Sequence, residues 1–378
     1  MSPQRRSKVR TISEWLIWTA SALIPKNPRL VVLQSLTESE DGVQAVERRL
    51  LARGHSPIRL TDVKASAYRS PSVRYYRKLS IRGLWSFARS GVLITSHALF
   101  GGLSKAAGQR NVLLWHGEVV KPVGKLHNDR ALAADLAPVC SELGQGYRCA
   151  EFRLQPEQVP VIGAPRNDRM LQADRRAVRR RLGWSEQDAV WLWLPTYRGA
   201  LSGGRGGDTV PSSNGLPFDD ASLGYLTERL ASAKITLVLK PHPMASVNVG
   251  EAREGLHVVR QHQIENSGTS LYEMLAAADG LVTDASSVWI DYLLTKRPII
   301  FAFPDIEEYR QRRGLNLEPY EDWAPGPIAR DGDTLVRLMT EFRAGQDRYA
   351  KHRSEMLTRF HQYRDAGSAD RLLDLLGF

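Results

Sequence analysis

The chain has 378 residues, of which 42% are hydrophobic and 25% are charged, and its 52 Lys and Arg exceed its 41 Asp and Glu to give a net charge of +11. This composition excludes a disordered chain, and the length favours two domains over a single core. The excess of positive charge indicates an anionic partner, such as a phosphate-bearing substrate, an anionic membrane or a nucleic acid.

The two cysteines, Cys140 and Cys149, are not surrounded by a pattern of metal ligands, so we expect neither a zinc site nor a disulfide framework. A reducing cytoplasmic setting fits these two cysteines better than an oxidising compartment does. No apolar run reaches the roughly 18 to 20 residues that a membrane-spanning helix needs.

The first 28 residues predict a basic amphipathic helix. Thr11 and Glu14 form a capping box after a basic start, and Pro25 marks the end of the helix. The apolar stripe within residues 12–24 fits a helix that lies in a membrane surface, and it equally fits one that packs on the protein's own body. No small-residue cleavage site follows, so the segment is interpreted as retained, not as a signal peptide.

From Leu30 onward, strand and helix patterns alternate, which is typical of parallel α/β domains. The expected strands are 30–33, 57–60, 92–95, 112–115 and 159–162, followed by 190–194, 235–239, 257–259, 280–283 and 298–301. A Gly- and Ser-rich stretch, 201–217, is interpreted as a loop at the edge of an active site. We predict two Rossmann-like domains that face each other across a cleft, residues 29–170 and 171–378, with the last helix able to cross back.

Polar residues follow several of these strands, at the edge where open α/β sheets bind ligands. After strand 112–115 comes His116, then Gly117 and, a few residues on, Lys121. An imidazole can take a proton from an attacking hydroxyl near neutral pH. We therefore predict that His116 is catalytic, although a structural role is more common for an isolated histidine.

Strand 235–239 leads into Lys240-Pro241-His242-Pro243, where two prolines stiffen the backbone around a cation and a second imidazole. Such a loop suits a pyrophosphate leaving group. The alternative is a capped turn with a surface lysine.

Strand 280–283 leads into Thr283, Asp284, Ser286 and Ser287 at the start of a helix expected at 288–294. Serines, backbone amides and the helix dipole together predict a phosphate cradle. Ser and Asp are also ordinary helix caps, and Asp284 is equally suited to holding a histidine or a donor hydroxyl.

Two further loops each offer an arginine whose planar guanidinium suits phosphate oxygens. They are Gly163-Ala164-Pro165-Arg166-Asn167-Asp168 and Pro195-Thr196-Tyr197-Arg198. Each arginine could instead pair with a neighbouring carboxylate.

Taken in order, these motifs resemble the CDP-glycerol:poly(glycerophosphate) glycerophosphotransferase family of teichoic acid and capsule synthesis. The resemblance runs from about Val92 to the C-terminus and includes Trp115-His116-Gly117, Lys240-Pro241-His242-Pro243 and Phe360-His361-x-Tyr363-Arg364-Asp365. It departs at Glu118-Val119-Val120, where Thr-Pro-Leu is usual, and at Ala285, where Tyr is usual.

The resemblance implies a GT-B-like fold, with an N-terminal acceptor domain and a C-terminal half that holds a CDP-glycerol or CDP-ribitol donor. It implies that His116 and His242 are the essential pair and that Gly117 and Lys121 lie on the acceptor side. The donor phosphates are expected to contact Arg166, Asp168, Thr196, Arg198, Lys240, Thr283, Asp284, Ser286 and Ser287.

The expected reaction is attack of an acceptor hydroxyl on the β-phosphorus of the donor, with release of CMP. No acid-rich metal motif stands out, so no metal or other cofactor is expected. His116 is assigned as general base and His242 as phosphate stabiliser or acid, and these roles are interchangeable. The expected acceptor is an undecaprenyl-diphosphate-linked saccharide, and the small size favours the priming enzyme over a polyol-phosphate polymerase.

Two alternative hypotheses for the function remain. One is a GT-B glycosyltransferase that uses a nucleotide sugar. The other is a binding protein without activity, because residues 74–89 interleave bases with aromatics, as membrane or nucleic-acid surfaces do. A lipid or acceptor-diphosphate role for that stretch is favoured over nucleic acid, since no nucleic-acid-binding motif accompanies it; an amphipathic helix with a solvated basic face is the structural alternative. We expect peripheral attachment to the cytoplasmic face of an anionic membrane, with other envelope-polymer enzymes as candidate partners.

Overall fold

The computed structural model describes residues 21–62, 68–99, 103–127, 132–196, 220–241, 252–253 and 255–378. Most of the helix predicted within residues 1–28 lies outside this part of the chain, as do His242, Arg198 and the loop 201–217. Among the described helices, none is both long enough and apolar enough to cross a bilayer.

The chain divides into two compact units, each built on its own parallel sheet. Unit 1 comprises residues 1–116, 124–169 and 365–378, and unit 2 comprises residues 117–123 and 170–364. The short segment Gly117–Val123 thus belongs to unit 2, where Asn316 donates hydrogen bonds to the carbonyls of Val119 and Val120.

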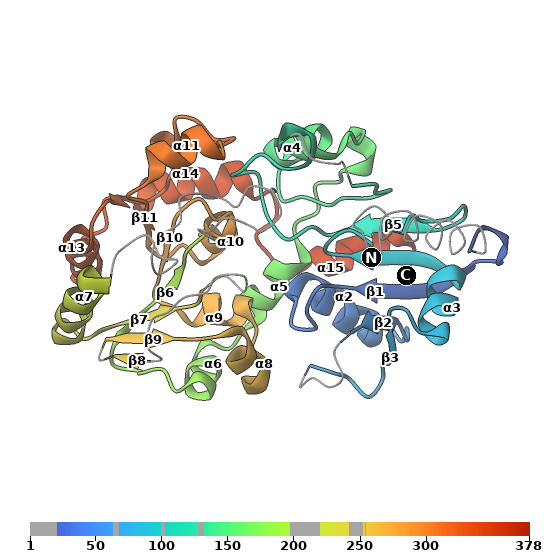
Figure 1. Ribbon diagram of the computed structural model, residues 1–378, viewed down its shortest axis with the longest axis horizontal. Coiled ribbons are helices and arrows are strands. Elements are labelled where there is room, and N and C mark those ends of the chain that lie inside the picture. The colour runs from blue at the N-terminus through green and yellow to red at the C-terminus, as the bar shows by residue number, and fades with distance from the viewer. Residues whose placement is uncertain are drawn as a thin grey trace, which may run out of the picture. The chain divides into compact units, whose positions relative to one another are not determined.

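Unit 1 has a five-stranded sheet in the order β3-β2-β1-β4-β5, with every pair parallel (Figure 1). Its elements are β1 (Asn27–Gln34), α2 (Asp41–Ala52), β2 (Ile58–Thr61), β3 (Arg74–Arg77), α3 (Ile81–Arg89), β4 (Ser90–Thr95), β5 (Arg110–Leu113), α4 (Glu142–Phe152) and α15 (Ser368–Leu376), with short 3-10 turns at Gly124–His127 and Pro156–Gln158.

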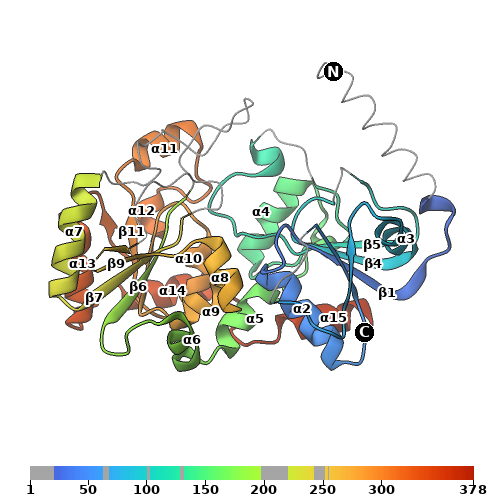
Figure 2. The same ribbon diagram turned by 60° about the horizontal axis from the view of Figure 1, so that its bottom comes forward.

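Alternation along β1 explains how helices cover both faces of this sheet. Val31 and Leu33 pack with apolar residues of α2 and α15, whereas Val32 packs with Phe87 of α3. Since successive side chains of a strand point to opposite faces, one strand supplies two cores. Asp370 of α15 also pairs with arginines of α2 and the residue after it, so the end of the chain is held beside α2 (Figure 2).

Unit 2 has a seven-stranded sheet in the order β12-β11-β10-β6-β7-β9-β8, in which only the edge pair β8 and β9 is antiparallel. Its elements are α6 (Arg175–Leu182), β6 (Ala189–Leu194), α7 (Asp220–Ser232), β7 (Ile235–Leu239), β8 (Ala252–Arg253), β9 (Leu256–Val258), α8 (Gln261–Ser267), α9 (Leu271–Ala277), β10 (Gly280–Thr283), α10 (Val288–Tyr292), β11 (Ile299–Ala302), α11 (Ile306–Arg312), α12 (Tyr320–Trp323), β12 (Ile328–Ala329), α13 (Gly332–Arg343) and α14 (Ala350–Phe360), with a 3-10 turn at Leu293–Thr295. The helix α5 (Pro165–Gln172) spans the point where the units divide.

One face of the unit 2 sheet is covered by α7 and α13, which lie side by side in both views (Figure 1, Figure 2). Trp191 and Trp193 of β6 are almost fully buried against this pair of helices, with Leu226 and Met339. The predicted α/β class with parallel sheets is therefore confirmed, while the arrangement of the two units across a cleft stays a prediction.

The structure departs from the expected elements at three places. Residues 159–162 form no strand, and Val161 makes only an isolated bridge to Val139, because Pro160 has no amide hydrogen to donate to a neighbouring strand. The stretch 74–89, for which one amphipathic helix was the structural alternative, is strand β3 followed by α3. The two-residue strands β8 and β12 were missed, since two residues are too short to show alternation.

Candidate functional site

The strand order of unit 2 places a group of predicted site residues at one edge of the sheet. Numbered from β6, with the hairpin strand β8 set aside, the sheet has the order 3-2-1-4-5-6 of doubly wound folds, which bind ligands where the order reverses. That point lies between β6 and β10. Thr196 follows β6 and Asp284 follows β10, so both sit at this reversal.

The structure joins these two residues directly. The backbone amide of Thr196 donates to both carboxylate oxygens of Asp284 at 2.9 and 3.1 Å, and the Thr196 hydroxyl donates to the same carboxylate. Thr283 is also buried, and its hydroxyl donates to the carbonyl of Leu194 at 2.8 Å. The three polar side chains are therefore used to fix the two loops to each other.

Tyr320 adds a third support to this edge. Its hydroxyl donates to the backbone carbonyl of Asp284 at 2.9 Å, and its ring is fully buried against Phe301 and Phe303. Sequence patterns did not single out Tyr320, because it lies far along the chain in the short helix α12.

Lys240 occupies the same edge at the end of β7, the neighbour of β6. Its backbone amide donates to the carbonyl of Trp193 at 3.0 Å, and the residue is only 8% exposed. Burial lowers the pKa of the Lys240 ammonium to about 8, while the charge of Glu265 opposes this shift. A buried cation with a lowered pKa is a group that an anionic ligand would stabilise.

Ser286 and Ser287 are half-buried and precede α10. The predicted helix 288–294 is shorter than expected, since α10 has five residues and continues as a 3-10 turn, and the Ser287 side chain makes no capping hydrogen bond. The helix-dipole part of the predicted phosphate cradle is therefore weak here. The loop is close to Gly117, because a Cβ added to Gly117 would lie 2.8 Å from the Ser287 hydroxyl.

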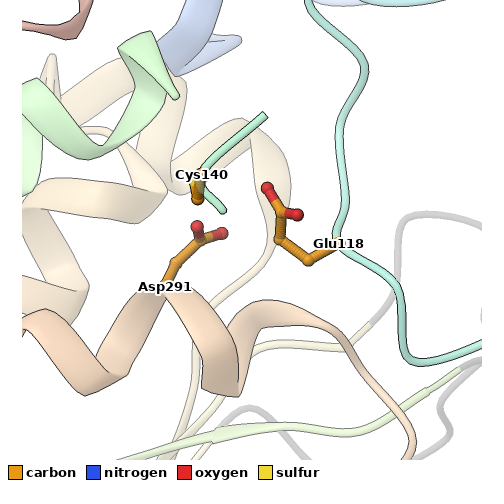
Figure 3. Close-up of side chains that lie close together, drawn as sticks. All are labelled: Glu118, Cys140 and Asp291. Carbon is orange, nitrogen blue, oxygen red and sulfur yellow. The ribbon is translucent and has the colours of Figure 1, made fainter. Parts of the chain in front are cut away.

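Two carboxylates of unit 2 also come together near these residues. Glu118 and Asp291 have carboxylate oxygens within 4.8 Å of each other (Figure 3), and Tyr272 donates to Asp291 at 2.6 Å. Cys140, labelled in the same figure, belongs to unit 1. Two carboxylates alone are fewer ligands than magnesium or calcium ions usually take, so the expectation of a metal-free site stays a prediction.

In unit 1, His116 follows β5 and is packed between aromatic neighbours. Its ring lies 4.2 Å from that of His97, with 9° between the planes, and 4.2 Å from the ring of Trp115. Trp115 has a φ of 54°, which is rare for a bulky residue and costly unless the surroundings hold it. Strain of this kind next to a polar side chain is typical of functional sites.

The charges around His116 are positive. The protein atoms that surround the ring lower the pKa of His116, and His97, Arg148 and Arg166 lower it further, while the Ser96 carbonyl opposes them. His116 nevertheless keeps solvent-exposed surface. The imidazole is therefore neutral at neutral pH before any anion binds.

Arg148 was not singled out by sequence patterns, and the structure buries it beside Trp115. Its guanidinium lies 5.6 Å from the Trp115 ring and 5.3 Å from the Phe152 ring, and it pairs with Glu151. It holds the Trp115-His116 loop from the side of α4.

The loop Gly163–Asp168 has a contact that the sequence did not predict. Asp168 accepts hydrogen bonds from the amides of Ser368 and Ala369 at 3.0 and 2.8 Å, and a Cβ at Gly163 would meet the Ser368 hydroxyl. These two residues thus hold the start of α15. Arg166 is buried in the first turn of α5 and adds positive charge near His116.

Three predicted site residues remain: Lys121, Arg198 and His242. Lys121 is half-buried in the segment Gly117–Val123. His242 and Arg198 lie outside the described residues, so their roles stay predictions.

Comparison with known proteins assigns a family. The family model described as CDP-Glycerol:Poly(glycerophosphate) glycerophosphotransferase matches residues 16–377. The teichoic acid poly(glycerol phosphate) polymerase of Bacillus spizizenii is 23% identical over 86% of this chain and 86% of its own length. The teichoic acid glycerol-phosphate primase of Bacillus subtilis is 26% identical, and the match covers 60% of this chain and 52% of the primase.

A solved structure of the wall teichoic acid polymerase TagF has the same fold. It matches with a TM-score of 0.80 over 99% of this chain and 97% of that chain, at 18% identity. At this level of identity the likeness shows the fold alone.

Proposed function

Because the chain belongs to the CDP-glycerol:poly(glycerophosphate) glycerophosphotransferase family, we propose that it transfers a polyol phosphate from a cytidine-diphosphate donor to a lipid-linked saccharide acceptor. Glycerol phosphate is the proposed group, and the priming step is the proposed place of the reaction. The observation that supports this most is the polar edge of the unit 2 sheet, where Thr196 and Asp284 meet at the reversal of strand order and Lys240 follows the neighbouring strand β7.

In this proposal unit 2 binds the donor. Lys240 neutralises phosphate charge, and the bond between Thr196 and Asp284 holds the two loops that shape the pocket. The hydroxyls of Ser286 and Ser287 and the backbone around them supply hydrogen bonds to phosphate oxygens. Arg198 and His242 are proposed to complete the set, because phosphoryl transfer depends chiefly on positioning and charge stabilisation.

His116 is the proposed general base. The acceptor hydroxyl gives its proton to the imidazole as its oxygen forms a bond to the β-phosphorus, and the bond from that phosphorus to the CMP oxygen breaks with its electron pair. His242 stabilises the charge on the departing CMP. The polyol is then joined to the acceptor by a phosphodiester.

The lowered pKa of His116 has a use in this scheme. The protein atoms around the ring are the main cause of this shift, followed by His97, and Arg148 and Arg166 add smaller contributions. A bound diphosphate would offset the contribution of these cations and raise the pKa of His116, so that the imidazole becomes a stronger base when the donor is present.

A panel of donors tests the proposal. The protein is incubated with CDP-glycerol, CDP-ribitol or a UDP-sugar, together with a soluble analogue of the lipid-linked disaccharide, and nucleotide release is followed by chromatography. We expect CMP from a CDP-polyol. Turnover of UDP-sugars alone would instead establish a sugar transferase.

Mass spectrometry of the product separates priming from polymerisation. One added polyol phosphate per acceptor is expected for the priming step. A ladder of products that differ by one repeating unit would assign the chain to the polymerases instead.

A surface of unit 1 supports attachment to a membrane. We define the β3–α3 surface by exposed Arg74, Arg77, Arg82 and Arg89 together with the apolar Leu79, Ile81 and Trp85. The apolar side chains are 69%, 88% and 53% exposed, respectively, and Arg89 lies over the Trp85 ring. Apolar side chains surrounded by arginines suit the boundary between anionic headgroups and acyl chains, so the proposed occupant is an anionic bilayer on its cytoplasmic face.

Flotation with lipid vesicles tests this surface. The protein is expected to float with vesicles that contain phosphatidylglycerol and to remain behind with phosphatidylcholine alone. Replacing Leu79 and Ile81 by Ser should weaken flotation, whereas the same change at exposed Leu375 of α15 should leave it unchanged. Equal flotation of all three proteins would contradict the assignment.

A further inference from the structure

Two histidines of unit 1 meet where the carboxyl ends of neighbouring strands come together. His97 lies two residues beyond β4, and His116 lies three residues beyond β5, the strand next to β4. Their rings are stacked, with centroids 4.2 Å apart and 9° between the planes. Nothing in the sequence patterns gave His97 a role.

Ser96 contacts a ring nitrogen of each histidine. Its hydroxyl lies 2.9 Å from Nδ1 of His97, and its carbonyl oxygen lies 3.5 Å from Nδ1 of His116. Ser96 is fully buried, so both contacts are made by a fixed residue. Because a carbonyl only accepts hydrogen bonds, this contact favours the neutral tautomer in which Nδ1 of His116 carries the proton and Nε2 the lone pair.

The groups around the pair are cations. Burial and then Lys78 lower the pKa of His97 to about 4. The protein atoms around its ring, His97, Arg148 and Arg166 lower that of His116. Two parallel imidazoles in contact repel each other when both are charged, so a proton on either ring disfavours a proton on the other.

We propose that His97 is a positioning residue, whose stacked ring holds His116 in one orientation, neutral, with Nε2 ready to take the proton of the acceptor hydroxyl. This inference rests on the proposed role of His116 as general base. His97 itself touches neither donor nor acceptor in this scheme, and it acts only through His116.

A pair of variants separates the ring from its charge. His97→Phe keeps an aromatic ring in the stack but removes the nitrogen that can be protonated, whereas His97→Asn can still bond Ser96 but removes the stack. The matched control is His55→Phe, which makes the same chemical change in unit 1 at a ring that contacts Phe378 instead.

The first measurement follows the titration of His116 by NMR of protein labelled in the histidine rings, with the signal assigned from its loss in His116→Asn. We expect His116 to titrate at a higher pH in His97→Phe than in the wild type, and at the wild-type pH in His55→Phe. An unchanged titration in His97→Phe would overturn the proposal. Since this experiment needs no substrate, it stands even if no CDP-polyol is turned over.

The second measurement is the pH profile of kcat/KM for CMP release. In His97→Phe the acid limb is expected to move to higher pH, with little change in the KM for the donor. In His97→Asn the loss of orientation is expected to reduce kcat by about tenfold to a hundredfold. If the variants changed only the thermal stability and left the profile and kcat alone, His97 would be structural. If the wild type released no CMP from any donor, the proposed function would fail while the NMR result would still decide the role of His97.

Discussion

The backbone amide and the side-chain hydroxyl of Thr196 both donate hydrogen bonds to the carboxylate of Asp284. These two residues are separated by 88 positions in the chain, yet they lie at the ends of neighbouring strands. The bond therefore fixes the geometry of two loops at the place where a doubly wound sheet binds its ligand.

Thr196→Val removes the hydroxyl but retains the shape of the side chain. Because Thr196 and Asp284 are buried, we expect a loss of about 1–3 kcal/mol in the free energy of unfolding and a higher KM for the donor. Thr196→Ser keeps both donors and is the control. Urea denaturation and donor kinetics of the two variants check this, and equal behaviour of Val and Ser would refute it.

Gly117→Ala probes the contact between the loop after His116 and Ser287. The added Cβ would stand 2.8 Å from the Ser287 hydroxyl, which can rotate away at small cost in stability but is then misplaced for the donor. We expect a raised KM for the donor and little change in melting temperature.

Two further variants control this experiment. Gly146→Ala places a methyl group in open space on α4 and should leave the KM unchanged, with a slight gain in stability. In Ser287→Ala the clash is absent, so adding Gly117→Ala should have less effect than it does in the wild type. Additive effects would show that the two residues do not act together.

Lys240→Met tests whether the buried ammonium strengthens donor binding and lowers the stability of the folded protein. Burial disfavours the charge, so we expect the Met variant to be more stable than the wild type and to bind the donor more weakly. Calorimetry for stability and titration with donor for affinity measure the two effects. A variant that lost both stability and binding would argue for a structural lysine.

The difference in stability between the wild type and Lys240→Met should depend on pH in one direction. The pKa of Lys240 is about 8 in the folded protein and near 10.5 when unperturbed, so the unfolded chain binds more protons between these values. The wild type should therefore gain stability relative to the Met variant as the pH rises from 8 to about 10.5. Below pH 8 the difference should be constant.

Acid should destabilise unit 1 for a related reason. The pKa values of His97 and His116 are lowered in the folded protein, so the unfolded chain takes up protons first as the pH falls through about 6.5. We expect the melting temperature to fall between pH 7 and pH 5, and to fall less in His97→Phe than in His55→Phe. An equal fall of the melting temperature in both variants would contradict the predicted contribution of His97.

Much of this could be predicted from the sequence, because the evidence is local. Strands such as 92–95 and 280–283 are short apolar runs bounded by polar residues, and the structure has them as β4 and β10. The residues that follow strands pointed to Thr196, Lys240 and Asp284. His97 also follows a strand end, that of β4, so the same criterion applied to every strand includes His97.

Other parts depend on contacts between distant segments, which no local pattern contains. The sequence predicts that Asp168 contacts donor phosphate, which stays a prediction, but it does not predict that the Asp168 carboxylate accepts the amides at the start of α15, 200 positions away. Tyr320 supports Asp284 only because α12 packs beside β11. The segment at Pro160 had the composition of a strand but lacked the amide that a ladder requires.

We propose that His116 and His242 carry the transfer of a polyol phosphate from a CDP-polyol. The most direct test is CMP release from CDP-glycerol in the presence of the acceptor analogue by the wild type, His116→Ala, His242→Ala and the control His55→Phe. We predict that both Ala variants lose the activity while keeping the wild-type circular dichroism spectrum, and that His55→Phe remains active. Release of CMP at the wild-type rate by either Ala variant would show that the replaced histidine is not needed for the transfer.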